Sequence, residues 1–403
     1  MSADRPLRVL QVIPSLAART GGTAESVVQS SIALQNYGLE TTIFATELGS
    51  AVSARQPSRV SASALPSGAE ELDVRLFPTR RPHSFAFSPE LYRALAKATG
   101  GYDVVHIHSL FLFPQLAAYR QAVRQRVPYV VTPHGILDPY HRQHGRLRKQ
   151  VTDVLWQRRL LEGASALHLT SDEEARLVAD VAPAVPRVIA SIGVHWPRFQ
   201  NLPEPERFRR EQLGGHSGPI VLHLGRVSHK KGPDVLIRSF AVASREFPEA
   251  RLVFVGPDDE GLTPKLTALA AELGIDSKVT FTGMLPGEDS KLQALAAADV
   301  WALSSNAENF GIAVAEAMAA GRAIVISPLV NIAPEIARAN AGLVCERSPE
   351  AFGAGIASLL RDAGLREELG GRAREFAKGY DWAALAPGLA QVYDGACSVP
   401  EVA

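Results

Sequence analysis

The chain has 403 residues, of which 46% are apolar and 21% are charged, and its formal net charge is zero. This composition is typical of a soluble globular protein and excludes a disordered chain. Because one hydrophobic core rarely grows beyond about 250 to 300 residues, the length predicts two domains. The two cysteines, Cys345 and Cys397, are too few for a disulfide framework or a Cys-based zinc site.

The N-terminal segment carries only a short and interrupted apolar run, which does not match a signal peptide. No stretch reaches the roughly 18 apolar residues that a membrane span needs, so we expect a cytoplasmic protein. Residues 116–160 hold nine basic residues against two acidic ones: Arg120, Arg124, Arg126, Arg142, Arg146, Arg148, Lys149, Arg158 and Arg159 against Asp138 and Asp153. Such a cluster is either a solvated helix face or a contact for an anionic acceptor or membrane. We expect peripheral contact with the inner face of the cytoplasmic membrane and no nucleic-acid partner.

Short β-branched runs alternate with helical stretches along the whole chain, which predicts an α/β fold with doubly wound parallel sheets. In the first half the predicted strands are Leu7–Ile13, Thr41–Thr46, Asp103–His108, Tyr129–Thr132, Ser165–Thr170 and Arg187–Ser191. In the second half they are Pro219–Gly225, Arg251–Gly256, Lys278–Gly283, Asp299–Ser304, Arg322–Ser327 and Ala341–Glu346. Between the halves, residues 193–218 have the Pro, Gly and charge content of a linker.

The boundaries follow from this pattern. We expect an N-terminal domain over residues 1–195, a C-terminal domain over 196–378, and a terminal segment over 379–403 with a helix at Trp382–Ala396. The Ser- and Ala-rich stretch 51–69 has little apolar periodicity and predicts a surface excursion.

A basic loop follows the first strand of the second half. In open α/β sheets ligands bind at the carboxyl ends of strands, where helix N-termini favour phosphate. Arg226 and Lys231 stand in this loop, and Gly225 and Gly232 allow the backbone to approach a ligand closely. The pattern favours a clamp for a diphosphate, with a merely solvated basic loop as the alternative.

Two glutamates, Glu308 and Glu316, are separated by seven residues around a turn that ends at Gly311. Glu316 is the only acidic residue in 312–321, and a carboxylate among alanines needs a partner, such as the paired hydroxyls of a ribose. Glu308 precedes the helix and would reach past the phosphates to the sugar. The alternatives are a solvent-facing or Arg322-paired Glu316, and a Glu308 that only favours the helix dipole.

In the first half, Gly21 and Gly22 precede a helix and permit close approach to an anion or a sugar. His134 follows the strand Tyr129–Thr132 in a sharp turn, where it can donate to a sugar hydroxyl or stabilise charge. We interpret His106 and His108, which alternate on one strand, as packing and supporting residues. The acidic turn 258–260 lacks supporting ligands, so no metal is expected.

These motifs resemble the family 4 retaining glycosyltransferases of the bacterial group 1 type, which build exopolysaccharide, lipopolysaccharide and glycolipids. The matching segments are Gly21–Gly22, Thr132–Pro139, Gly225–Arg226 with Lys231–Gly232, and Glu308–Gly311 with Glu316. Two features depart from the family pattern: Asn309 stands where glycine is common, and Ser191–His195 stands where Asn-Gly-Val-Asp is usual.

The resemblance implies a GT-B architecture, in which two Rossmann-like domains face each other across a cleft and the terminal helix returns to the N-domain. It also implies the residue roles. Arg226 and Lys231, with Gly22 and Gly311, would bind the donor diphosphate, and Glu316 the ribose. Asn309 and Phe310 would hold the sugar, Met284 and Leu285 would border the base, and His134 and Glu308 would be catalytic.

The implied reaction moves a hexose-like sugar from a UDP or GDP sugar to a hydroxyl of an acceptor sugar or lipid-linked saccharide, with retention and without a cofactor or metal. Two alternatives remain open on the sequence. One is a nucleotide-sugar epimerase or another nucleotide-dependent Rossmann enzyme, weakly suggested by Glu47 at a strand end, although no G-x-G-x-x-G is present. The other is an inactive sugar-binding subunit.

Overall fold

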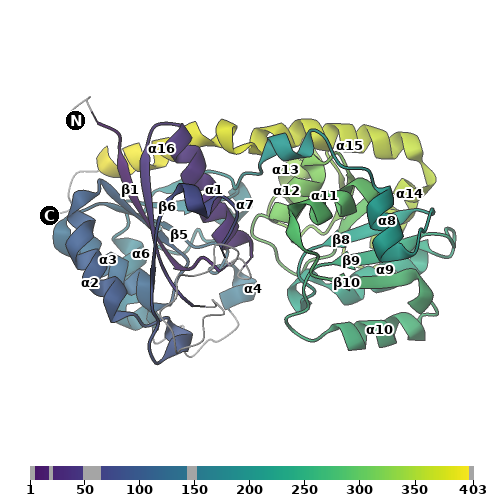
Figure 1. Ribbon diagram of the computed structural model, residues 1–403, viewed down its shortest axis with the longest axis horizontal. Helices are drawn as coiled ribbons and strands as arrows, with labels where there is room; N and C mark the ends of the chain where they lie inside the picture. The colour runs from purple at the N-terminus through teal and green to yellow at the C-terminus, as the bar shows by residue number, and fades with distance from the viewer. Residues whose placement is uncertain (1–4, 18–20, 49–64, 143–151, 399–403) are drawn as a thin grey trace. The chain divides into compact units, whose positions relative to one another are not determined.

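The structure, a computed structural model, describes residues 5–17, 21–48, 65–142 and 152–398. The chain divides into two compact units, Met1–Gly193 with Trp382–Ala403 (unit 1) and Val194–Asp381 (unit 2). The observed divisions thus fall after residues 193 and 381, whereas the sequence predicts boundaries after residues 195 and 378. Figure 1 shows that each unit is built around one sheet with helices packed against it.

Unit 1 contains a seven-stranded sheet in the order β3-β2-β1-β4-β5-β6-β7, and the neighbouring strands pair in parallel. Its strands are β1 (Arg8–Ser15), β2 (Glu40–Thr46), β3 (Asp73–Phe77), β4 (Val104–His108), β5 (Tyr129–Thr132), β6 (Ala166–Leu169) and β7 (Arg187–Ile189). The central strands are buried along almost their whole length, as expected for a parallel sheet covered on both faces.

The helices of unit 1 are α1 (Gly22–Asn36), α2 (Pro89–Ala98), α3 (Phe113–Gln125), α4 (Pro139–Arg142), α6 (Arg158–Glu162), α7 (Asp172–Leu177) and α16 (Trp382–Ser398). Ser88 and Ser171 begin α2 and α7 by accepting backbone N–H bonds, which satisfies donors that a helix start leaves free. Leu10, Val105 and Ile107 pack against residues of α2 and α3. The alternating residues Gln11 of β1 and His106 of β4 face the other side of the sheet, where both bond to Tyr393 of α16. On that side α16 contacts α1 (Figure 1).

Unit 2 contains a six-stranded parallel sheet in the order β10-β9-β8-β11-β12-β13. Its strands are β8 (Ile220–Leu224), β9 (Arg251–Val255), β10 (Val279–Gly283), β11 (Val300–Leu303), β12 (Ala323–Ile326) and β13 (Leu343–Val344). Its helices are α8 (Glu206–Leu213), α9 (Pro233–Ala243), α10 (Thr263–Glu272), α11 (Gly287–Ala297), α12 (Ile312–Ala319), α13 (Ala333–Arg338), α14 (Pro349–Arg361) and α15 (Ala363–Ala377). A core of strand residues such as Val221 and Phe254 packs against α9 and α14.

Every strand predicted from the sequence overlaps an observed one, and β3 is the one observed strand among the described residues that was not predicted. Its sequence includes Asp73 and Arg75, and its residues are exposed or half-buried because the strand lies at the sheet edge. Such a strand lacks the apolar run that identifies buried strands. The predicted surface excursion lies largely outside the described residues. Within the described ranges, no helix is both long enough and apolar enough to cross a membrane.

Candidate functional site

The strand order of unit 2 reverses between β8 and β11, from which the chain leaves in opposite directions along the sheet. In open parallel sheets this reversal leaves a crevice at the carboxyl ends of the two strands, and ligands bind there. β8 ends at Leu224 and β11 at Leu303. The loops that follow, residues 225–232 and 304–311, carry Arg226, Lys231 and Glu308, so the fold brings these predicted residues to one place.

The two loops are hydrogen-bonded to each other. The Asn306 backbone N–H donates to the Lys230 carbonyl over 2.7 Å, and its side-chain amide donates to the His229 carbonyl over 2.6 Å. The Ser304 hydroxyl donates to the Gly232 carbonyl over 2.7 Å. Gly232 has φ 64°, and a Cβ there would stand 2.4 Å from the Ser304 carbonyl oxygen. Only glycine therefore allows this approach.

Lys231 and Glu308 form an ion pair across the two loops, in which the lysine Nζ donates to a carboxylate oxygen. Their side chains are only 16% and 12% exposed, and Lys230 Nζ lies 3.9 Å from the other oxygen of Glu308. Burial alone would raise the pKa of Glu308, but Lys231 and Lys230 hold it below its ordinary value. Glu308 is therefore an ionised carboxylate surrounded by cations.

Glu316 is paired as well, with a residue that the sequence analysis did not consider. Lys291 of α11 donates to its carboxylate, and the Glu316 side chain is 13% exposed. Arg322, the partner weighed from the sequence, instead donates to the carbonyls of Ala320 and Ala298 over 3.1 and 3.2 Å. Lys291 is the only basic residue of α11, which is the signal that could have identified it.

The other predicted residues of unit 2 lie on the same segment or at the end of β10. Gly311 has φ 81° and precedes α12, whose first backbone N–H groups have no partner within the helix. Phe310 is buried with its ring edge-on to Tyr380, 5.1 Å between centroids, so its backbone rather than its ring can face a ligand. Asn309 is half-buried, Arg226 is exposed, and Met284 is 63% exposed beside the half-buried Leu285.

In unit 1 the corresponding strand reversal lies between β1 and β4. Gly22 begins α1 after Gly21, which has φ 83°. His134 follows β5 with φ 54°, and the next residue, Gly135, donates its N–H to Glu174 over 3.0 Å. Glu174 also accepts the N–H of Thr170 over 2.7 Å, so one buried carboxylate braces the turn that carries His134.

Three further histidines stand behind His134. Its Nε2 lies 3.0 Å from Nδ1 of His108, and His106 and His168 are also buried in unit 1. Burial, with a contribution from His168, lowers the pKa of His134 to about 3, and burial holds the pKa of the other three below the ordinary value. All four rings are therefore neutral at physiological pH. Sequence reasoning assigned His106 and His108 a supporting role but missed His168.

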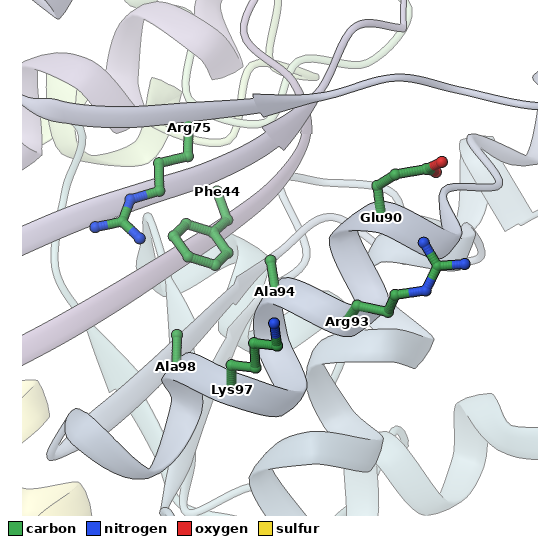
Figure 2. Close-up of a pocket in the computed structure, with 7 residues that line it drawn as sticks. All are labelled: Phe44, Arg75, Glu90, Arg93, Ala94, Lys97 and Ala98. Atoms are coloured by element: carbon green, nitrogen blue, oxygen red, sulfur yellow. The ribbon is translucent and has the colours of Figure 1, made fainter.

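A surface pocket of about 540 Å³ lies elsewhere on unit 1 (Figure 2). It is lined by Phe44, Arg75, Glu90, Arg93, Ala94, Lys97 and Ala98 of β2, β3 and α2. The Arg75 guanidinium donates to the Asp73 carboxylate over 2.9 Å and lies 5.4 Å from the centroid of the Phe44 ring. Glu90 forms an ion pair with Arg80. None of the predicted site residues lines this pocket.

Both units match models of glycosyltransferase families. Residues 21–193 match the glycosyl transferase 4-like domain, and residues 205–376 match the family described as glycosyl transferases group 1. Relatives include D-inositol 3-phosphate glycosyltransferases from Nocardia farcinica and Salinispora arenicola. The first is 29% identical over 93% of this chain and 85% of the relative, and the second is 30% identical over 76% and 72%.

Solved structures show the same fold at lower identity. Anabaena HepE, in complex with UDP and glucose, superimposes with a TM-score of 0.77 at 18% identity, covering 96% of this chain and 99% of that one. Sucrose-phosphate synthase from Thermosynechococcus elongatus gives 0.75 at 21% identity over 96% and 98%. The expected α/β fold of GT-B type is confirmed. The protein belongs to the group 1 glycosyltransferase family.

Proposed function

We propose that the protein transfers a hexose-like unit from a UDP or GDP sugar to an acceptor hydroxyl with retention of the anomeric configuration. The observation that carries the proposal is the largely buried Lys231–Glu308 ion pair, 16% and 12% exposed, at the carboxyl ends of β8 and β11. A second, half-buried pair joins Lys291 of α11 to Glu316 on α12, the helix that begins after the same loop. A nucleoside diphosphate sugar needs cations for its phosphates and carboxylates for its hydroxyls, and this segment supplies both.

In the ligand-free protein, Lys231 is neutralised by Glu308. A diphosphate competes for the lysine, together with Arg226 and the free N–H groups at the start of α12. Glu308, relieved of part of its partner, then accepts hydrogen bonds from the sugar. Glu316 accepts the ribose hydroxyls in addition to the Lys291 ammonium, because a carboxylate offers about four acceptor sites.

The proposed chemistry needs no protein nucleophile. The acceptor oxygen forms a bond to the anomeric carbon on the face from which the diphosphate leaves, and its proton passes to the departing phosphate. Arg226, Lys231 and the α12 dipole stabilise the charge of the leaving group, in place of a metal. We propose His134 as the residue of unit 1 that acts at the donor sugar. Activity undiminished by EDTA would support the metal-free assignment, and activity restored only by a divalent cation would contradict it.

The known proteins support parts of this assignment. The UDP and glucose bound by HepE support a UDP sugar as donor. The relatives named for D-inositol 3-phosphate support a phosphorylated polyol as acceptor, beside the sugar or lipid-linked saccharide of polysaccharide and glycolipid assembly. A screen that includes both acceptor classes separates these possibilities.

The donor site is tested by a thermal-shift titration with UDP and GDP. A ligand that binds only the folded state raises its stability by mass action, so one of the two should raise Tm. We expect Lys231→Ala and Arg226→Ala to abolish most of the shift, whereas Lys265→Ala on the exposed face of α10 should preserve it. A full shift in Lys231→Ala, or none with either nucleotide in the unaltered protein, would remove the assigned site.

We also propose that unit 1 contacts an anionic membrane. Val154 and Leu155 are 82% and 61% exposed on the π-helix η6 (Asp153–Gln157), and the exposed Arg158 and Arg159 follow directly. Apolar side chains beside arginines suit the interface of an anionic bilayer. The side chain of Arg142 and the expected basic residues Arg146, Arg148 and Lys149 lie outside the described residues.

Sedimentation with vesicles tests this contact. Val154→Ser with Leu155→Ser should release the protein from phosphatidylglycerol vesicles, whereas Val123→Ser, at a 54% exposed position, should not. Equal binding to neutral and anionic vesicles, or unchanged binding of the double variant, would contradict the proposal.

A further inference from the structure

Unit 1 contains a continuous chain of side-chain hydrogen bonds that runs from the backbone carbonyl of Ala190 to His134. We refer to it as the histidine chain. Its members, in order, are Ala190 O, His168, Thr132, His106, Tyr393, Gln11, His108 and His134, and the successive distances are 2.8, 2.9, 2.7, 2.9, 3.2, 2.7 and 3.0 Å. Each side chain except that of the half-buried His134 is buried.

Four strands and the C-terminal helix contribute to the histidine chain. Gln11 comes from β1, His106 and His108 from β4, Thr132 from β5 and His168 from β6, while Tyr393 comes from α16. Within the described part of the chain, no three His, Cys, Asp or Glu side chains are grouped to hold a metal. The rings instead bond to one another and to neutral partners. Neutral imidazoles have one donor and one acceptor nitrogen, so each bond has a direction.

The carbonyl of Ala190 sets that direction, because a carbonyl oxygen only accepts. His168 must therefore donate from Nε2, which leaves its Nδ1 as an acceptor. Nδ1 of His168 accepts the Thr132 hydroxyl proton, and the Thr132 oxygen accepts from Nε2 of His106. Each ring is neutral because burial holds its pKa low, so no ring can donate from both nitrogens.

The same logic carries the direction onward. Nδ1 of His106 accepts the Tyr393 hydroxyl proton, and the Tyr393 oxygen accepts from the Gln11 amide nitrogen. The Gln11 amide oxygen accepts from Nε2 of His108, whose Nδ1 then accepts from Nε2 of His134. His134 is left with a proton on Nε2 and a lone pair on Nδ1.

The opposite direction fails at one end. If His134 accepted at Nε2, every donor along the histidine chain would be reversed, and His168 would present the Nε2 lone pair to the Ala190 carbonyl at 2.8 Å. Two acceptors would then face each other in a buried place, at a cost of about one to several kcal/mol. Only one of the two directions satisfies every member.

We propose that the histidine chain is a positioning device that fixes His134 as the neutral Nε2–H tautomer, with Nδ1 as a hydrogen-bond acceptor. Among the described residues none bonds to this Nδ1. Nδ1 can therefore accept a hydrogen bond from a hydroxyl group. This assignment rests on the proposed function, in which the hydroxyl belongs to the donor sugar. Thr132 and Tyr393 act through His134 and are positioning residues.

The tautomer is read by long-range ¹H–¹⁵N NMR of the full chain labelled at histidine nitrogen, with the His134 signals assigned by His134→Asn. The couplings to the two carbon-bound ring protons distinguish the protonated nitrogen from the bare one. We expect His134 in the Nε2–H form. An Nδ1–H form, or an equal average of the two, would overturn the proposal without any bearing on the reaction.

Two breaks in the histidine chain make the test specific. Thr132→Val removes the hydroxyl that joins His168 to His106, whereas Thr132→Ser keeps it. Tyr393→Phe removes the hydroxyl that joins His106 to Gln11, and the control Tyr129→Phe removes a buried hydroxyl that only donates to the Leu160 carbonyl. Thr132→Val and Tyr393→Phe should give a mixed His134 tautomer, and both controls should keep the original one. An unchanged tautomer in both breaking variants would refute the device.

Kinetics then test the assignment to the donor sugar. Loss of one well-oriented hydrogen bond in the transition state corresponds to about a tenfold fall in kcat. We expect this fall in Thr132→Val, with rescue in Thr132→Ser and with an unchanged thermal shift by the nucleotide. A retained unit 1 transition in calorimetry shows that the variant is folded. If the tautomer is mixed while kcat is unaltered, the donor-sugar role is wrong although the donor site of unit 2 stands.

Discussion

The ion pair between Lys231 and Glu308 allows the most quantitative test of the site in the absence of ligand. The two side chains are 16% and 12% exposed, so most of each charge is removed from water. Breaking a buried pair by removing one partner typically costs about 3 to 5 kcal/mol. Lys230, 3.9 Å from the Glu308 carboxylate, retains part of the stabilisation. We therefore expect Lys231→Met to lower the free energy of unfolding of unit 2 by about 2 kcal/mol.

A double-mutant cycle isolates the pair from other effects of each substitution. Glu308→Gln should also destabilise unit 2, while the Lys231→Met, Glu308→Gln variant should be more stable than the sum of the single changes predicts, by about 1 to 2 kcal/mol. Differential scanning calorimetry without nucleotide measures each variant. The unit 2 transition is recognised in the unaltered protein as the one that UDP or GDP shifts. Strict additivity of the two substitutions would refute the assignment of a stabilising Lys231–Glu308 ion pair.

The pH dependence of this coupling has a definite sign. Lys231 and Lys230 hold the folded-state pKa of Glu308 below its ordinary value of 4.5. The carboxylate therefore contributes stability above pH 4.5, and this contribution is lost as the pH falls through the lowered pKa. The coupling in the cycle should be constant between pH 6 and 8 and should decline in acid. A coupling that grows on acidification would contradict the ionised state of Glu308.

Three further predictions concern other parts of the chain. Lys291→Met should leave the Glu316 carboxylate without its lysine and weaken nucleotide binding about tenfold by titration calorimetry; unchanged binding would remove Lys291 from the site. Gly256→Ala should destabilise unit 2 by about 3 kcal/mol or more, because its Cβ would stand 2.0 Å from the Gly225 carbonyl oxygen, whereas Gly274→Ala, in open space, should cost about 1 kcal/mol; equal costs would contradict this packing. The four histidines of the histidine chain in unit 1 have lowered pKa values, so the stability that they contribute as neutral rings is present above pH 6.5. As the pH falls below 6.5, the free energy of unfolding of unit 1 should decrease by up to about 1.4 kcal/mol per histidine and pH unit. Calorimetry that finds unit 1 equally stable at pH 7.5 and pH 5.5 would refute this prediction.

The strands and the site loops could be predicted from the sequence, but the long-range partners of the site residues could not. Buried parallel strands such as β8 and β11 have continuous apolar runs, and the position of a loop after a strand places Lys231 and Glu308 at the same sheet edge. The contact between them joins residues 77 positions apart and requires the order in which β8 and β11 lie side by side. That order is a property of the assembled sheet rather than of any local pattern.

The residues that were not predicted have no local sequence pattern that indicates their contact partners. Lys291 is an ordinary helical lysine until α11 packs near α12 and brings it to Glu316. The partner of His106, Tyr393, is 287 positions away in the sequence. The edge strand β3 was missed for a different reason, because its charged residues fit a half-exposed position and break the apolar run.

The proposed reaction is tested most directly by the configuration of the product. The protein is incubated with UDP and GDP sugars and with a panel of saccharide and phosphorylated polyol acceptors, and NMR follows the anomeric proton while nucleoside diphosphate release is quantified. We predict release that depends on acceptor and a product that keeps the donor's anomeric configuration, both lost in Lys231→Ala. An inverted product, or release of equal size in Lys231→Ala, would contradict the proposed function.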